Sequence, residues 1–172
     1  MLMQKPEIID NALAPMEFEA LHTIIGGLNF PWYWNPRLNE FQKLNTTKDQ
    51  KLNHCFLNHN FNIFNHDVAA PYDKIFKPLL KLLKINVLIR VHSNMYHCTP
   101  TLEEHTDHKD QHFPCQAALL YLNTCDGSTL IYQKHRVKSV ANRLVTFRGD
   151  CFHHSTSCTD QKRRLVINVN YI

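Results

Sequence analysis

The stretch Ile85-Asn86-Val87-Leu88-Ile89-Arg90-Val91-His92 decides the fold class of this chain. Isoleucine and valine occupy every second position in it. A period of two is typical of a β-strand, whose successive side chains point to opposite faces. The residues just before it, 72–84, have lysines on one side and apolar pairs elsewhere, which is the pattern of an amphipathic helix. The pattern therefore changes from helix to strand near residue 85.

The chain after this stretch is a series of short strand candidates. Turn-like residues such as Asn123–Gly127 and Ala141-Asn142 separate them. The further candidate strands are residues 115–123, 128–133, 136–140, 143–148, 151–155 and 163–171. Many short strands at this spacing favour an all-β sandwich or barrel.

The first half of the chain, residues 1–84, has a helical and irregular pattern. Apolar residues recur at helical spacing after Pro15, and Gly26-Gly27 would end that helix. Pro78 predicts a kink or a late start in the second helix. Because the helices precede the strands, we expect them to buttress one sheet.

Two segments of this first half have two interpretations each. The aromatic cluster at residues 30–34 fits packing of the first helix against the barrel, and it also fits a lid or substrate wall. The polar stretch 35–70 fits a loop over an active-site mouth and equally an ordinary irregular segment.

The composition bounds the class of protein. A chain of 172 residues with 44% hydrophobic and 20% charged residues fits one domain, residues 1–172, with a real core. The net charge of +4 is too mild to require nucleic acid. No apolar run is long enough to span a bilayer, and no signal peptide is recognisable at the start, so we expect no membrane and a cytoplasmic location. The six cysteines form no CxxC pair, and we expect free thiols.

One group of polar residues indicates chemistry. His105-Thr106-Asp107 is followed by His153-His154 and then by Arg164. Residues i and i+2 of a strand share a face, so one segment could present an imidazole and a carboxylate to one metal. Two histidines and one carboxylate on one face of Fe(II) leave positions open for cosubstrate and oxygen. The His-x-Asp pattern alone is weak evidence in a chain with 12 histidines.

The last candidate strand strengthens this interpretation. Its alternate residues Arg164, Val166, Asn168 and Asn170 form a largely polar face. A small barrel normally fills its interior with apolar side chains, so this face indicates either a lined pocket or an exposed side of the sheet. An arginine in a pocket suits a carboxylate, because its guanidinium is a fixed-charge fork.

Together these residues resemble the Fe(II)/2-oxoglutarate-dependent dioxygenases, in particular their prolyl-hydroxylase-like branch. The resemblance covers residues 86–172 well and the first half loosely, and the whole chain is also similar to small oxygenases of phage and marine microbial genomes. The matching stretches are Asn94–Tyr96, His105–Asp107, Ala118–Asn123, Asn142–His153 and Arg163–Asn168. The resemblance implies a mainly β protein: a double-stranded β-helix, or jelly roll, formed by residues 85–172, with the helical and irregular residues 1–84 as support.

The resemblance also implies a set of site residues. It assigns iron to His105, Asp107 and one of the two adjacent histidines. Of these two, His153 is favoured over His154, because the family's histidine follows an apolar residue, here Phe152. It assigns the distal carboxylate of 2-oxoglutarate to Arg164 and Tyr121, and the pocket wall near the metal to Tyr96. Tyrosine is also common in strands, so plain core packing is the alternative for both tyrosines.

The implied activity is hydroxylation of an unactivated C–H bond, with release of succinate and CO2. Its cofactors would be Fe(II), 2-oxoglutarate and O2, with ascorbate in support. A protein or peptide side chain such as proline is the expected substrate, in the cytoplasm or, for a phage-encoded chain, the host cytoplasm. Three alternatives stay open: oxidation of a nucleobase or nucleotide, a non-catalytic binding module on the same fold, and a zinc hydrolase. The chain departs from the family at Cys98–Thr101 and around Gly127, where glycine-rich turns are common.

Overall fold

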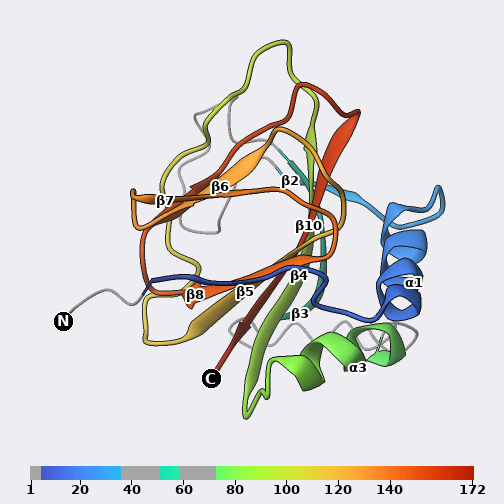
Figure 1. The fold of residues 1–172 in the computed structure, drawn as a ribbon. Coiled ribbons are helices and arrows are strands. Elements are labelled where there is room, and N and C mark those ends of the chain that lie inside the picture. Colours follow the sequence, from blue (N-terminus) through green and yellow to red (C-terminus); the bar gives the residue numbers. More distant parts are fainter. Residues whose placement is uncertain (1–4, 36–50, 59–72) are drawn as a thin grey trace.

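A computed structural model describes residues 5–35, 51–58 and 73–172 of the chain. Two antiparallel sheets face each other, and two helices cover the outer side of the larger sheet (Figure 1). This arrangement confirms the predicted jelly roll with buttressing helices. No helix within the described ranges combines the length and the apolar character needed to cross a membrane.

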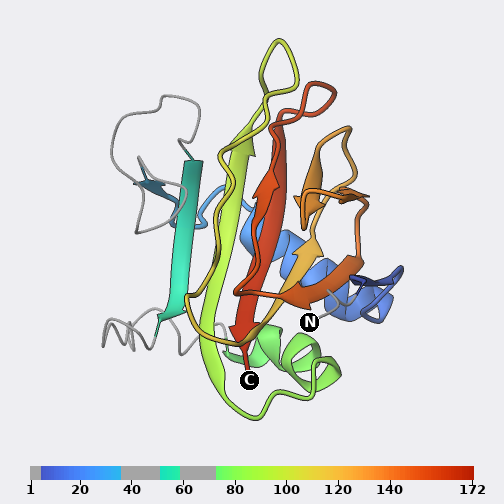
Figure 2. The ribbon, with the colours of Figure 1, turned by 90° about the vertical axis from the view of Figure 1, so that its left-hand side faces the viewer.

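The larger sheet has seven strands in the order β1-β8-β5-β10-β4-β3-β2. The long strands β10 and β4 lie side by side at its centre, as Figure 2 shows, with Arg164 paired to Tyr96 and Asn168 to His92. The strands of this sheet are β1 (Glu7–Ile9), β2 (Tyr33–Asn35), β3 (Lys51–Asn58), β4 (Leu88–His97), β5 (Gln116–Tyr121), β8 (Arg143–Arg148) and β10 (Arg163–Tyr171).

The smaller sheet has three strands in the order β7-β6-β9. They are β6 (Ser128–Ile131), β7 (His135–Lys138) and β9 (His153–Ser155). A fourth segment, residues 104–108, lies along the free edge of β9 through isolated bridges between Glu104 and Thr156 and between His108 and His153. The predicted histidine motif therefore lies beside β9, opposite the larger sheet.

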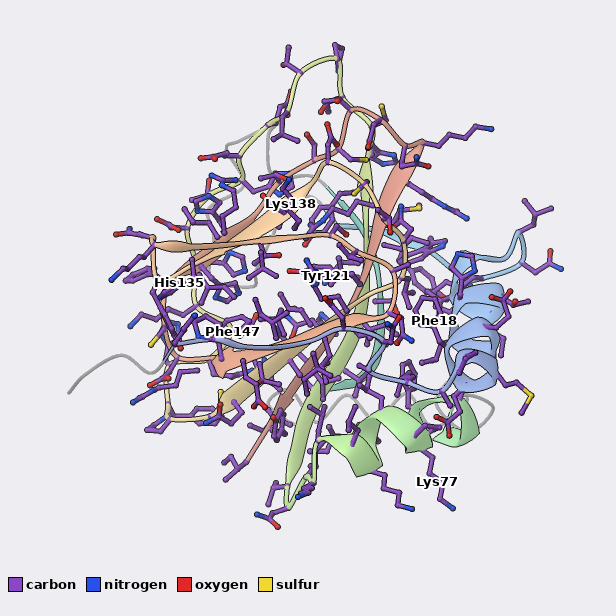
Figure 3. The ribbon with its side chains drawn as sticks, in the orientation of Figure 1. Phe18, Lys77, Tyr121, His135, Lys138 and Phe147 are labelled. Carbon is purple, nitrogen blue, oxygen red and sulfur yellow. The ribbon has the colours of Figure 1, made fainter. Side chains whose placement is uncertain are left out.

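Alternation along the strands separates two cores. One face of the larger sheet packs against the helices α1 (Pro15–Gly26) and α3 (Asp73–Leu82). Leu21, Ile25 and Leu79 of these helices are fully buried against it. The other face looks toward the smaller sheet and carries a second cluster, which includes Tyr96, Tyr121 and Phe147. Figure 3 shows Tyr121 and Phe147 inside the barrel, whereas Lys77 of α3 points away from it.

The structure decides between the two interpretations of the aromatic cluster where it is described. Phe30 is buried, and its ring meets that of Trp32 edge-on at 4.8 Å between centroids. Trp32 packs against the core shared with the helices. These two rings therefore have the packing role. Helix α3 runs through Pro78 from Asp73 to Leu82.

The first half of the chain contributes more than support. Strands β1, β2 and β3, which the sequence pattern did not predict, extend both edges of the larger sheet. Strand β3 falls in the polar stretch 35–70, and the rest of that stretch, apart from Asn35, lies outside the described residues. Short or polar strands lack the alternation from which sequence reasoning identifies them.

Asn142 ties the N-terminal segment to the barrel and carries the first prediction. Its side chain accepts a hydrogen bond from Leu13 N at 3.0 Å and donates one to Leu13 O at 2.8 Å, while its φ of 60° is left-handed. Asn142→Ala should lower the free energy of unfolding by about 3 kcal/mol, since two hydrogen bonds are lost and alanine is strained at this φ. Urea denaturation measures the change. Asn142→Gly relieves only the strain, so its free energy of unfolding should lie between those of the wild type and Asn142→Ala. Equal stability of all three proteins would contradict this role.

Candidate active site

Arg164 lies at the start of β10 and points between the two sheets. Its side chain is fully buried. Its guanidinium donates to the Oγ1 of Thr129 at 2.9 Å and to the carbonyl of Thr156 at 3.3 Å, and its Nε has no hydrogen-bond partner among the described residues. Neither of these partners is charged. Because an isolated buried charge is costly, the site calls for an anion.

Two tyrosines line the guanidinium. The rings of Tyr96 on β4 and Tyr121 on β5 each lie 5.3 Å from the Cζ of Arg164. The Tyr121 hydroxyl is buried and makes no well-aligned hydrogen bond within the described part of the chain. Burial raises the pKa of both tyrosines, so their hydroxyls stay protonated and can donate. Arg164 and Tyr121 thus offer unused donors in a water-poor space.

The neighbouring Gly127 permits this close packing. A Cβ atom at Gly127 would lie 2.5 Å from the carbonyl oxygen of Ser157 and 2.7 Å from the Cδ of Arg164. Only glycine fits there without displacing the arginine stem or the backbone. The departure noted in the sequence therefore leaves the one glycine that this position requires.

A second buried arginine on the same face of the sheet, Arg90, does have a charged partner. Arg90 of β4 donates to the carboxylate of Asp110 at 2.7 Å. Asn168 and Asn170 of β10 donate to the same carboxylate at 2.9 to 3.2 Å. Burial would raise the pKa of Asp110, but the charge of Arg90 acts with His153, His108 and the hydrogen bond from Asn170 to hold that pKa far below the usual range. Arg90 is thus neutralised inside the protein, and Arg164 is not.

A cluster with the composition of a metal site lies beside this network. One ligand atom from each of His108, Asp110 and His153 lies within 4.8 Å of the other two. The ring of His153 meets that of His108 at a tilt, 4.5 Å between centroids, and that of Phe147 edge-on at 4.9 Å. Its Nδ1 bonds the carbonyl of Cys151 at 3.1 Å. Two imidazoles and a carboxylate match the ligand set of non-haem Fe(II) oxygenases. A metal there would compete with Arg90, Asn168 and Asn170 for the Asp110 oxygens.

Only one of the three predicted iron ligands lies in this cluster. His153 belongs to the cluster, but His105 and Asp107 do not. The Nδ1 of His105 bonds the Oγ of Ser155 at 2.8 Å, and its ring stacks on Tyr96 at 5.0 Å, on the side of Arg164. The prediction that His105 and Asp107 bind iron is not tested by these contacts and stays a prediction.

Asp107 instead lies with the other histidine. Its carboxylate bonds the Nδ1 of His154 at 2.7 Å and accepts from Gln133 at 2.9 Å. Burial would raise the pKa of Asp107, but these hydrogen bonds outweigh it and hold the pKa below its usual value. The side chain of Asp107 is 32% exposed, against 3% for that of Asp110.

An irregularity in the backbone explains why the side chains of His105 and Asp107 contact different residues. The bridges run from Glu104 to His108 on one segment and from Thr156 to His153 on the other, so the first segment carries one residue more. Such a bulge breaks the alternation of side chains. The rule that residues i and i+2 share a face holds only for a regular strand, and the sequence gives no sign of the bulge.

Sequence reasoning passed over a second His-x-Asp pattern. His108-Lys109-Asp110 follows the first motif by three residues and has the same spacing. The signal was therefore available in the printed sequence. The pairing of Asp110 with Arg90 could not be predicted, because the two residues are far apart in the chain.

Comparisons with known proteins bear on the fold. No family model matches the sequence, and no curated protein matches it. Among solved structures, a Pseudomonas putida prolyl-4-hydroxylase aligns with 96% of this chain and 91% of its own at 15% identity and a TM-score of 0.58. A viral collagen prolyl hydroxylase from Paramecium bursaria Chlorella virus-1, in complex with 2-oxoglutarate, aligns with 98% and 97% at 14% identity and a TM-score of 0.55.

A third similar structure has another activity. The non-haem α-ketoglutarate-dependent carbocyclase SnoK from nogalamycin biosynthesis aligns with 98% of this chain and 79% of its own, at 12% identity and a TM-score of 0.66. Identities this low show the fold and not the substrate. The chain has the fold of the 2-oxoglutarate-dependent Fe(II) oxygenases, prolyl hydroxylases among them.

Proposed function

We propose that this protein is an Fe(II)- and 2-oxoglutarate-dependent oxygenase. The observation that carries the proposal is Arg164, a fully buried guanidinium whose hydrogen-bond partners are both neutral. Next to it the Tyr121 hydroxyl is a second unused donor. The distal carboxylate of 2-oxoglutarate would satisfy both groups, through charge-assisted hydrogen bonds that are strong away from water.

The iron would be held by His153 and one of the two His-x-Asp pairs. His108 and Asp110 are already next to His153, but the Asp110 carboxylate is engaged by Arg90 and two asparagines. His105 and Asp107 lie within the bulged segment 104–108, and Asp107 would have to exchange His154 and Gln133 for the metal. When bound, iron and 2-oxoglutarate would supply the oxidising chemistry, with succinate and CO2 as products, O2 as oxidant and ascorbate in support.

The remaining site residues would bind and orient. Tyr96 and Tyr121 line the buried Arg164 guanidinium, and a site that is poor in water strengthens its attraction for a carboxylate. Ser155 fixes the ring of His105 against Tyr96. These contacts would hold the cosubstrate in one orientation before it reacts.

For the substrate we propose a protein or peptide side chain such as proline. Two of the similar structures described above are prolyl hydroxylases, and a Trichoplax adhaerens prolyl hydroxylase in complex with a peptide fragment aligns with 97% of this chain at a TM-score of 0.59. Nucleobase oxidation would be favoured by aromatic rings at the mouth of the site, whereas the partly buried Trp32 packs against the helix-side core. Reaction with a panel of peptides, followed by mass spectrometry for the gain of one oxygen atom, tests the proposal.

Metal removal tests the activity itself. The purified protein, freed of metal with a chelator, should release succinate from 2-oxoglutarate under air only after Fe(II) is added back. Zn²⁺ should not restore the reaction, since it has no redox chemistry. Succinate is measured by mass spectrometry, with denatured protein and the same Fe(II) as the control. Failure of Fe(II) to bind, with no succinate formed, would refute the oxygenase; hydrolytic activity restored by Zn²⁺ would favour the zinc hydrolase.

A further inference from the structure

Two cysteine thiols lie around the turn that joins β9 to β10. Cys98, just after β4, and Cys158 are partners in a parallel bridge, fixed by hydrogen bonds from Thr99 N to Cys158 O and from Cys98 N to Lys162 O. The Cys98 thiol points to the carbonyl of Thr159 at 3.6 Å, and the Cys158 thiol to that of Gln161 at 3.4 Å. Both sulfurs thus gather at the same turn, and the two cysteines are free.

The backbone geometry suits a disulfide. Neighbouring strands lie about 4.8 Å apart, so paired residues of a bridge have Cα atoms near that distance. Disulfides span Cα atoms about 4.4 to 6.8 Å apart. The Cα spacing typical of a bridge therefore falls within the range that a disulfide spans. The disulfide would close a loop from the end of β4 to the turn between β9 and β10.

We propose that Cys98 and Cys158 form a reversible thiol–disulfide site. Cys98 is exposed, so a peroxide or an oxidised low-molecular-weight disulfide reaches it first. Cys158 is fully buried, and burial raises its pKa to about 12, so Cys98 is oxidised before it. With hydrogen peroxide, Cys98 becomes a sulfenic acid and one water leaves. The Cys158 sulfur then displaces the hydroxyl group, the S–S bond forms, and its proton leaves in a second water.

A third thiol, that of Cys125, is the competing partner, because Cys125 as well as Cys98 acts on the pKa of Cys158. Cys125 is buried, and its neighbour Asp126 accepts hydrogen bonds from Thr159, so Cys125 lies near the same turn. No bridge of the backbone pairs Cys125 with either of the other two cysteines within the described residues. Replacing Cys125 should therefore leave the disulfide intact, whereas replacing the exposed Cys98 should abolish it without disturbing the core.

The experiment compares the wild type, Cys98→Ser and Cys125→Ser. Each folded, metal-free protein is treated with hydrogen peroxide, then alkylated in acid and digested. We expect a linked pair of peptides containing Cys98 and Cys158, with the mass of both less two hydrogen atoms, in the wild type and Cys125→Ser. The reductant dithiothreitol should reverse it. A link from Cys158 to Cys125, or no link to Cys158 at all in the folded protein, would overturn the assignment.

Thermal unfolding gives a second readout. Closing a loop of about 60 residues should raise the melting temperature of oxidised wild type by about 10 °C over the reduced form. Cys98→Ser should show no such difference between oxidised and reduced samples, and Cys125→Ser should behave as the wild type. Equal shifts in wild type and Cys98→Ser would place the effect elsewhere in the chain and refute the proposal. Neither readout depends on the proposed oxygenase activity.

Discussion

Replacement of Arg164 by alanine should weaken the binding of 2-oxoglutarate at least about 100-fold while Fe(II) still binds. Truncating one partner of a buried, hydrogen-bonded charge pair costs about 2 to 5 kcal/mol, and every 1.4 kcal/mol is tenfold. The effect is large because Arg164 is a charged donor in a buried space where its described hydrogen-bond partners are neutral. Calorimetric titration of 2-oxoglutarate into the Fe(II) protein without oxygen measures it.

Arg163 supplies the matched control for Arg164. It is the adjacent residue on the same strand, but its side chain bonds the carbonyl of Gly26 on the helix side of the sheet. Arg163→Ala should bind 2-oxoglutarate like the wild type. Tyr121→Phe, which removes one hydroxyl, should have an intermediate effect of about tenfold. If Arg163→Ala were the variant that lost 2-oxoglutarate, the cosubstrate site would be misassigned.

Loss of Arg164 could also affect folding, so a second variant protects the test. Arg164→Lys keeps a positive charge but not the planar fork that binds a carboxylate at two points. It should fold and bind 2-oxoglutarate more weakly than the wild type. Circular dichroism melts of each variant show whether a loss of binding reflects the site or the fold.

Replacement of His153 by alanine should reduce Fe(II) affinity at least about 100-fold, whichever aspartate completes the site. Groups that merely orient metal ligands change affinity by about 10- to 100-fold, and a lost ligand should cost no less. His154→Ala is the comparison. Because His154 bonds Asp107 and is not part of the His108, Asp110 and His153 cluster, it should cost no more than a group that orients a ligand, and a loss larger than that of His153→Ala would make His154 the ligand. Fe(II) binding without oxygen, measured by competition with a chromophoric chelator, compares the two variants.

The same measurement assigns the remaining ligands. His105→Ala with Asp107→Asn, and separately His108→Ala with Asp110→Asn, remove one pair each. Only one double variant should lose iron as severely as His153→Ala. Loss of iron binding in the variant His108→Ala with Asp110→Asn would assign the metal to the cluster of His108, Asp110 and His153. Loss of iron binding in the variant His105→Ala with Asp107→Asn would show that the segment 104–108 loses its bulge when the metal binds. Full iron binding by His153→Ala would refute both assignments.

The sequence predicted the architecture because the architecture depends on periodicity. The alternation in β4 and β10 is regular, and the turns between the later strands carry typical turn residues, so the barrel could be anticipated. Strands β1 and β2 escaped because three residues are too few to show a period. Alternation placed Arg164 on the polar face of β10 but left open whether that face lines a pocket, as the burial of Arg164 now shows, or is exposed. The partners of Asp110 did not follow from alternation, because contacts between Arg90, Asn168 and a loop carboxylate are set by tertiary packing.

The two outer strands of the larger sheet, β1 and β2, both come from the first 35 residues. Residues 85–172 alone would form a sheet whose margins are β8 and β4, each with a row of unpaired backbone groups. Open margins of this kind pair with other chains and promote aggregation. The first half of the chain thus moves the two edges of the sheet from the longer strands β8 and β4 to the three-residue strands β1 and β2, and so short an edge offers little for another chain to pair with.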